Sequence, residues 1–287
     1  MPRKIKDSKR QLVEFLTEHF FDAETKALNA VKLGIVYLNG KLVKRPGIEI
    51  DEDIDQIKVV GGGNIFVSRG GYKLQKALQL YDINLQDRIC LDIGASTGGF
   101  TDCMLQSGAS KVFAIDTGYG QIDWKLRTDP RVNLVERMNV RYLLPERLYA
   151  NVESVNKATF AAIDVSFISA IKVIPNVQGL LMGPDKSELV ILIKPQFEAG
   201  KNQVARGGLI KNPKIHLEIL SEFVSSCYRA GLEIKKITHS PILGASGNLE
   251  FVAYATWPKA GPKINLQLND WLSKIIDLAY TELGLKS

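Results

Sequence analysis

The stretch LDIGASTGGFT, residues 91–101, decides the fold that the sequence predicts. It follows an apolar segment with strand character and opens a segment with helical character. Its glycines let the backbone turn sharply and let a ligand approach it closely. A dinucleotide-binding turn has the pattern Gly-x-Gly-x-x-Gly, and the second of those glycines is missing between Gly94 and Gly98. The loop therefore indicates that the ligand is not a dinucleotide.

Two acidic residues frame this loop. Asp92 comes directly before it and suits a ligand with a cationic ammonium group, whereas it would sit poorly beside a pyrophosphate. Asp116 ends the next predicted strand, where a carboxylate can accept both hydroxyls of an adenosine ribose. Together they predict a site for S-adenosylmethionine, with a simple strand–helix turn as the alternative. The expected cofactor-binding residues, the last two beside the adenine, are Asp92, Gly94, Ala95, Ser96, Thr97, Gly98, Gly99, Phe100, Asp116, Met138 and Asn139.

From residue 86 onward, strand-like and helix-like segments alternate. Candidate strands lie at 88–93, 111–116, 131–135, 158–164, 187–194, 233–238 and 249–256, and a final helix is expected at about 267–282. This rhythm predicts an α/β fold: a doubly wound, Rossmann-like, mostly parallel sheet with helices on both faces. The turn-rich stretch 240–248 leaves no room for a crossover helix, so the last strand should enter the sheet antiparallel.

The N-terminal part has a different pattern. Residues 10–33 predict two short helices, with Asp22 as the N-cap of the second. Residues 35–43 predict a β-hairpin around Asn39-Gly40, a strong turn dipeptide. The glycine-rich stretch 61–64 marks a domain boundary. We therefore expect a small α+β domain at 1–60, a linker at 61–67 and a second domain at 68–287.

Composition limits the choice of partners and compartment. The formal net charge of +6 favours an anionic partner, either nucleic acid or an acidic membrane surface. Cys90, Cys103 and Cys227 show no metal-ligand spacing and are expected to be reduced thiols. No apolar run approaches the roughly 18 residues of a membrane helix, and no apolar signal core follows the basic N-terminus. We expect a cytoplasmic protein without a membrane span or a metal site, and the sequence leaves its oligomeric state open.

Three ionisable residues are expected to meet at one edge of the sheet. Asp164 and Lys194 end predicted strands, and ligands of open α/β sheets bind outside the carboxyl ends of the strands. An antiparallel last strand begins at that same edge, which brings Glu250 there. A ribose hydroxyl must lose its proton as it attacks a methyl group, and a neutral lysine amine can accept that proton. Lys194 is thus the candidate base, positioned by Asp164 and Glu250; the alternative is a purely structural ion-pair network.

Five stretches together carry a family resemblance: SRGGYKL (68–74), DIGASTGGFTDCMLQSGA (92–109), DVSFIS (164–169), KPQFEAG (194–200) and GNLEF (247–251). The chain resembles the TlyA family, long named haemolysin A and related to FtsJ-type ribose 2′-O-methyltransferases. The resemblance implies an FtsJ-like methyltransferase domain behind an N-terminal S4 RNA-binding domain. It implies S-adenosylmethionine as the methyl donor and a cytidine ribose 2′-hydroxyl of ribosomal RNA, alone or within ribosomal subunits, as the acceptor. It also implies a catalytic tetrad in which Lys73, expected to orient the substrate, joins Asp164, Lys194 and Glu250.

One departure concerns RNA binding. S4 domains commonly carry Ser/Thr-Arg at the start of their second helix, whereas residues 22–27 are more acidic and lack the arginine. Attraction to phosphate should then depend on other cations. The loop at 198–208 is either a lid that guides RNA or an ordinary surface loop. The expected RNA-binding residues are Arg3, Lys4, Lys9, Arg10, Lys26, Lys32, Lys41, Lys44, Arg45, Arg69, Lys201 and Arg206.

Two other functions compete with RNA methylation. The first is a membrane-active haemolysin, which the old family name suggests. The absence of an export signal, a membrane span and a long amphipathic β-hairpin in the sequence argues against it. The second is an RNA-binding module whose methyltransferase fold is inactive, and the intact tetrad argues against that.

Overall fold

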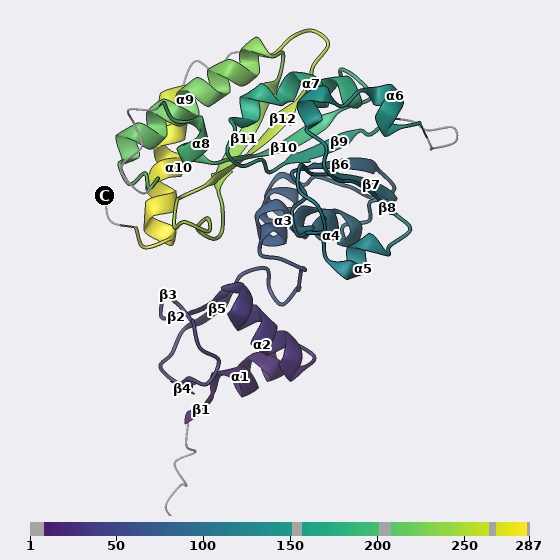
Figure 1. Ribbon diagram of the computed structural model, residues 1–287. Coiled ribbons are helices and arrows are strands. Elements are labelled where there is room, and N and C mark those ends of the chain that lie inside the picture. Colours follow the sequence, from purple (N-terminus) through teal and green to yellow (C-terminus); the bar gives the residue numbers. More distant parts are fainter. Residues whose placement is uncertain (1–8, 151–156, 201–207, 264–267, 286–287) are drawn as a thin grey trace, which may run out of the picture. The chain divides into compact units, whose positions relative to one another are not determined.

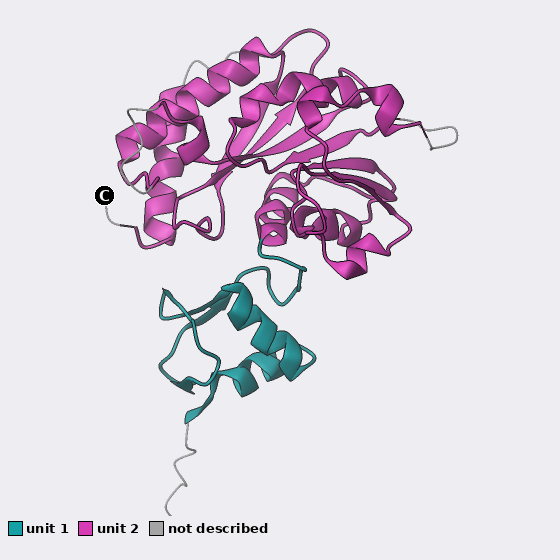
Figure 2. Ribbon diagram, in the orientation of Figure 1, with its two compact units in different colours: residues 1–69 teal, residues 70–287 magenta. Residues whose placement is uncertain are grey.

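The computed structural model describes residues 9–150, 157–200, 208–263 and 268–285 (Figure 1). The chain divides into two compact units, residues 1–69 and 70–287 (Figure 2). The linker expected at 61–67 falls at the end of the first unit, a few residues before this division. Each unit is described by itself below.

The first unit combines two helices with short strands. Asn39 and Gly40 both have positive φ, 49° and 76°, which is the backbone that a two-residue hairpin turn requires. The strands on either side of this turn pair antiparallel, and two helices precede them, so the predicted hairpin and the two predicted helices are present. The described elements are β1 (Lys9–Gln11), α1 (Leu12–His19), α2 (Glu24–Leu33), β2 (Val36–Leu38), β3 (Lys41–Leu42), β4 (Glu49–Asp51) and β5 (Ile57–Val59).

The expected capping role of Asp22 is wrong. The N-cap of α2 is Ala23, which makes no side-chain hydrogen bond to the helix. The Asp22 carboxylate instead lies 2.7 Å from the Lys26 ammonium, four residues later. This ion pair satisfies the carboxylate without the N–H groups of the first helical turn, and it holds the pKa of Asp22 below its ordinary value.

The second unit contains a seven-stranded sheet in the order β11-β12-β10-β9-β6-β7-β8. As predicted, β12 runs antiparallel to its neighbours β10 and β11, while the pairs from β10 through β8 are parallel. The doubly wound α/β prediction is confirmed. The strands are β6 (Ile89–Ile93), β7 (Lys111–Ile115), β8 (Val132–Val135), β9 (Phe160–Ile163), β10 (Glu188–Ile193), β11 (Glu233–His239) and β12 (Phe251–Thr256).

Helices cover both faces of this sheet. Figure 1 shows α3 and α4 on one face and α7 and α9 on the other. The described helices are α3 (Gly70–Tyr81), α4 (Gly99–Gln106), α5 (Trp124–Arg127), η1 (Val140–Tyr142), α6 (Pro145–Leu148), η2 (Ala170–Lys172), α7 (Ile174–Leu180), α8 (Pro195–Glu198), α9 (Pro213–Arg229) and α10 (Leu268–Glu282).

The core explains why the sheet forms in this register. The interior strand β10 reads ELVILI, and its last five residues are buried, as expected for a strand covered on both faces. Ile191, Ile193 and Phe251 belong to one apolar cluster with residues of α7, α9 and α10. In the described part of the chain, no helix is both long and apolar enough to cross a membrane.

Candidate active site

The loop after β6 turns at the carboxyl edge of the sheet. Gly94 has φ 90°, and a Cβ atom there would overlap the backbone carbonyl oxygen of Asp164 at the end of β9. Only glycine fits such a crossing, because any side chain would push the two strand ends apart. Gly98 has φ 93°, and a Cβ atom there would overlap the side chain of Leu126 and crowd that of Ile122. The glycines therefore set the loop tightly against its neighbours.

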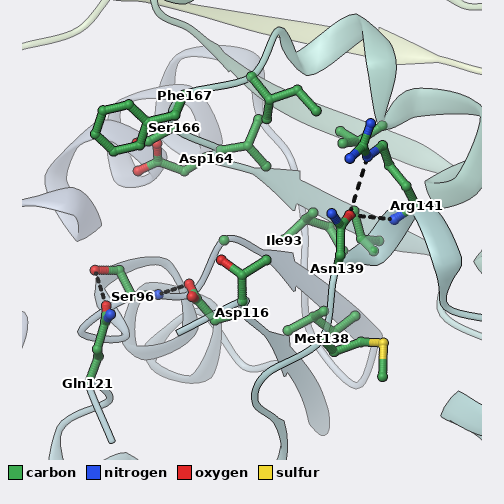
Figure 3. A pocket seen from close by; sticks show the side chains of 17 residues that line it. Ile93, Ser96, Asp116, Gln121, Met138, Asn139, Arg141, Asp164, Ser166 and Phe167 are labelled. Atoms are coloured by element: carbon green, nitrogen blue, oxygen red, sulfur yellow. Dashed lines mark hydrogen bonds between the residues drawn. The ribbon is translucent and has the colours of Figure 1, made fainter. Parts of the chain in front are cut away.

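Asp116, directly after β7, is held by one backbone amide of the loop after β6 and by one that follows Asp116 in the chain. The amide nitrogen of Ser96 donates to Asp116 Oδ2 at 2.8 Å, and that of Gly118 donates to Oδ1 at 2.6 Å. Figure 3 shows the Asp116 carboxylate at the wall of a cavity. Two backbone donors fix its orientation, so that its remaining lone pairs are available to a ligand.

A cavity of about 550 Å³ lies along this edge. Six of the predicted cofactor or catalytic residues line it: Gly94, Ser96, Asp116, Met138, Asn139 and Asp164. Sequence reasoning missed the other lining residues, although five of them come shortly after the end of β7 or β9 and strand ends were the available signal. These residues are Ile93, Ile115, Thr117, Gln121, Val140, Arg141, Val165, Ser166, Phe167, Ile168 and Val173.

The other predicted cofactor residues do not line the cavity. These are Asp92, Ala95, Thr97, Gly98, Gly99 and Phe100. Asp92 is fully buried, and its Oδ2 accepts a hydrogen bond of 2.6 Å from the Thr101 hydroxyl. Among the described residues its Oδ1 has no hydrogen-bond partner. Burial raises the pKa of Asp92 to about 7, because desolvation penalises the charged carboxylate.

Lys194 follows β10 and contacts two residues of the loop after β9. Its Nζ lies 2.6 Å from Asp164 Oδ1 and donates a hydrogen bond of 2.8 Å to Ser166 Oγ. The Lys194 side chain is 11% exposed and that of Asp164 is 20% exposed. Asp164 and Ser166 line the cavity, whereas Lys194 does not, so its ammonium group contacts the cavity wall through these two residues.

Lys73 and Glu250 form a second ion pair that is more completely buried. Lys73 Nζ on α3 lies 2.6 Å from Glu250 Oε2, and the two side chains are 8% and 4% exposed. The register of β10 and β12 pairs Ile193 with Phe251, so Lys194 and Glu250 occupy the next positions outward on neighbouring strands. The structure thus places all four predicted tetrad residues at one edge of the sheet, as two ion pairs.

The turn at 240–248 closes over Glu250. The amide of Ser240 donates to the Glu250 carbonyl oxygen at 2.7 Å. A Cβ atom on Gly244 would overlap Glu250 Oε1, so the turn lies directly against the carboxylate. A buried carboxylate in such a position requires a charged partner, which Lys73 supplies.

The expected RNA-binding residues fall into four groups. Arg3, Lys4, Lys201 and Arg206 lie outside the described residues. Arg10 and Lys26 are engaged within the first unit: Arg10 pairs with both Glu18 and Glu52 at 2.7 Å, and Lys26 pairs with Asp22. Arg69 is partly buried. The exposed cations of this set that form no ion pair with a described residue are Lys9, Lys32, Lys41, Lys44 and Arg45.

The doubly wound sheet with an antiparallel penultimate-edge strand, together with the acid that ends β7, defines the class of Rossmann-like methyltransferases. The methyl donor of this class is S-adenosylmethionine. The chain belongs to the family of FtsJ-like methyltransferases, whose family model matches residues 66–257. This match confirms the predicted methyltransferase fold, and the relatives named TlyA confirm the resemblance to the TlyA family.

Three comparisons illustrate the relationship. The chain is 39% identical over 281 residues to YqxC of Bacillus subtilis, provisionally named an rRNA methyltransferase, and the match covers 97% of each chain. It is 37% identical over 226 residues to the 16S/23S rRNA (cytidine-2′-O)-methyltransferase TlyA of Mycobacterium tuberculosis, covering 79% of this chain and 81% of that one. A solved structure from Streptococcus thermophilus, provisionally named a hemolysin, matches with 35% identity and a TM-score of 0.72, covering 97% and 98%. Hemolysin and methyltransferase names thus occur within one family.

Proposed function

We propose that this protein transfers a methyl group from S-adenosylmethionine to the 2′-hydroxyl of a cytidine ribose in ribosomal RNA. The observation that carries the proposal is the contact of Lys194 Nζ with Asp164 and Ser166, both of which line the cavity that contains Asp116. A candidate base and a candidate donor site therefore share one wall. The Mycobacterium tuberculosis relative, named for this reaction, supports the choice of acceptor.

The residues of the cavity fit the donor. Asp116 presents a fixed carboxylate for the ribose hydroxyls, and the apolar side chains of Met138 and Val140 suit the faces of an adenine. Asp92 would favour the cationic methionine end from behind the loop, through its charge. When bound, S-adenosylmethionine supplies an electrophilic methyl group on its sulfonium sulfur.

The acceptor hydroxyl must lose its proton to Lys194. The amine can take that proton only in its neutral form. Bond formation between the 2′-oxygen and the methyl carbon would break the bond from that carbon to the sulfonium sulfur, and S-adenosylhomocysteine would leave. Asp164 and Ser166 hold the Lys194 amine from one side. The buried pair of Lys73 and Glu250 would hold the neighbouring part of the site, and orient the substrate, at the same sheet edge.

The first unit would bind the RNA. We propose that residues 1–60 form an S4-like domain joined through a linker at 61–67 to the methyltransferase domain at 68–287. Its exposed cations Lys32, Lys41, Lys44 and Arg45 support this role, because phosphate contacts by lysine and arginine dominate affinity for nucleic acids. An enzyme with this substrate would work in the cytoplasm, on ribosomal RNA or on ribosomal subunits.

The direct test is methyl transfer onto ribosomal subunits that lack the modification, with labelled S-adenosylmethionine and mapping of the modified ribose. Lys194→Ala should lose transfer while its affinity for the donor, measured by calorimetry, stays near that of the wild type. Lys186→Ala removes an exposed lysine elsewhere in the same unit and serves as the control. Transfer at the wild-type rate by Lys194→Ala would overturn the assignment of the base.

A further inference from the structure

The ion pair of Lys194 and Asp164 joins two segments of the site, and these segments make three contacts with each other. The loop at 164–169 follows β9, and the segment at 194–198 follows β10. The first contact is that of Lys194 with Asp164 and Ser166. The second is the pair of rings Phe167 and Phe197, whose centroids lie 5.3 Å apart. The third lies at the far end of both segments and is made by Glu198.

Glu198 accepts two hydrogen bonds from the opposite loop. Its Oε2 accepts from the Ser169 hydroxyl at 2.5 Å, and its Oε1 accepts from the Ala170 amide at 2.7 Å. Ala170 is the first residue of η2, whose N-cap Ser169 makes no capping bond of its own. The carboxylate of a residue 28 positions away therefore takes the place of a local cap.

The environment of Glu198 shows that this carboxylate is held inside the protein. It is partly buried, and burial raises its pKa above the ordinary value, while the bonds from Ser169 and Ala170 and the charge of Lys172 act in the opposite direction. Hydrogen bonds to a charged acceptor are stronger than those between neutral groups. Glu198 does not line the cavity, so it has no direct contact with a ligand there.

The loop that Glu198 holds contains a strained residue. Phe167 has φ 62°, a left-handed backbone that is unfavourable for a bulky residue, and its side chain is 93% exposed. Such a conformation persists only where the surrounding contacts impose it. The Asp164 amide bonds to the Ile93 carbonyl at 2.9 Å at one end of the loop, and Glu198 binds the other end at Ala170.

We propose that Glu198 is a positioning residue for methyl transfer: it fixes the loop at 164–169 against the segment at 194–198 and thereby keeps Lys194 beside Asp164 and Ser166. This inference rests on the proposed function, because its kinetic consequence requires that Lys194 act in transfer. Its structural consequence, the order of the loop, can be measured without any reaction.

The test compares Glu198→Ala and Glu198→Gln in the full chain. Loss of bonds to a charged group is expected to lower kcat for transfer onto unmodified ribosomal subunits about tenfold in Glu198→Ala. The affinity for S-adenosylmethionine should fall less than kcat, because Glu198 itself does not line the cavity, although residues 164–168 of the loop do. Glu198→Gln keeps an oxygen acceptor for the Ala170 amide and should recover most of kcat. Amides of residues 165–170 should exchange with deuterium faster in Glu198→Ala than in the wild type.

Ser187→Ala is the matched control. Its hydroxyl donates to the Gly183 carbonyl at 2.8 Å, and the residue is buried in the same unit. It should lower the melting temperature without changing kcat or exchange at 165–170. Wild-type kcat and wild-type exchange in Glu198→Ala, or an equal loss of kcat in Ser187→Ala, would overturn the positioning role. A wild-type protein that transfers no methyl group to RNA would instead overturn the proposed function, and the exchange measurement would still decide the role of Glu198.

Discussion

Lys73 Nζ and Glu250 Oε2 lie 2.6 Å apart although 177 residues separate them in the chain. Both side chains are almost closed to solvent, whereas those of Lys194 and Asp164 are somewhat more open. This difference in exposure suggests that the two ion pairs have different roles at the sheet edge. In the proposed function, the buried pair of Lys73 and Glu250 would support the site, and the more open amine of Lys194 would accept the proton of the acceptor hydroxyl.

Removing one member of the buried pair should be costly. Lys73→Met leaves the Glu250 carboxylate buried without its partner, and Glu250→Gln leaves the Lys73 ammonium in the same state. Each should lower the free energy of unfolding by about 3–5 kcal/mol. The double variant should be more stable than either single variant, because no isolated charge remains. Urea denaturation of all three variants measures this, and single variants as stable as the wild type would show that the pair is solvated in solution.

Asp92 should make the folded protein less stable as the pH rises, which is the reverse of the usual effect of an aspartate. Its pKa in the folded state is about 7, above the value of about 3.9 for an unfolded aspartate. Between these values the folded state holds a proton that the unfolded state has lost, so this group lowers stability as pH rises from about 4 to 7. Above pH 7 the full loss, on the order of 4 kcal/mol, is present.

The variant Asp92→Asn keeps the size of the side chain and can still accept the Thr101 bond. It should melt at a higher temperature than the wild type at pH 8, with little difference at pH 4. It should also bind S-adenosylmethionine more weakly at pH 8, because the negative charge behind the loop is gone. Melting curves and calorimetry at both pH values check this. Equal melting temperatures at pH 8 would contradict the buried state of Asp92.

Gly244→Ala should displace the carboxylate of Glu250. The added methyl group would overlap Glu250 Oε1, while the backbone at Gly244 has no positive φ that would itself exclude alanine. We expect a loss of kcat for methyl transfer of about tenfold, equivalent to ~1.4 kcal/mol of misplacement. Gly179→Ala in α7 is the control, since a Cβ atom there meets nothing within 4 Å. Comparable kcat in the two variants would mean that the turn at 240–248 shifts to accommodate the methyl group and leaves Glu250 in place.

RNA affinity should depend on salt through the exposed cations of the first unit. Lys41 and Lys44 are exposed and pair with no described residue. Their joint replacement by alanine should weaken binding of ribosomal RNA and flatten the plot of log affinity against log salt by about 0.7–0.9 for each phosphate that a lysine no longer neutralises. Lys26→Ala, whose ammonium is already paired with Asp22, should change the slope less. If the salt slope changed equally in the Lys41/Lys44 variant and in Lys26→Ala, the RNA would not contact Lys41 and Lys44.

Local pattern was enough for the framework of this protein. The strands of the second unit, the glycine turn after β6 and the antiparallel β12 follow from apolar runs, turn residues and the length of 240–248, since each depends on neighbours in the chain. The shared edge of Asp164, Lys194 and Glu250 follows from strand direction alone. The hairpin at Asn39-Gly40 is encoded in the same local way.

Only the tertiary structure decided which side chains meet. Topology could not pair Lys73 with Glu250, because α3 precedes the sheet and its docking depends on packing across the whole unit. The position of Asp92 in the sequence did not show that its carboxylate is fully buried. The position of Asp22 did not show that its carboxylate pairs with Lys26 instead of capping α2. Strand ends and turns are set by short-range preferences, whereas burial and the pairing of charges are set by atoms that folding brings together from distant segments.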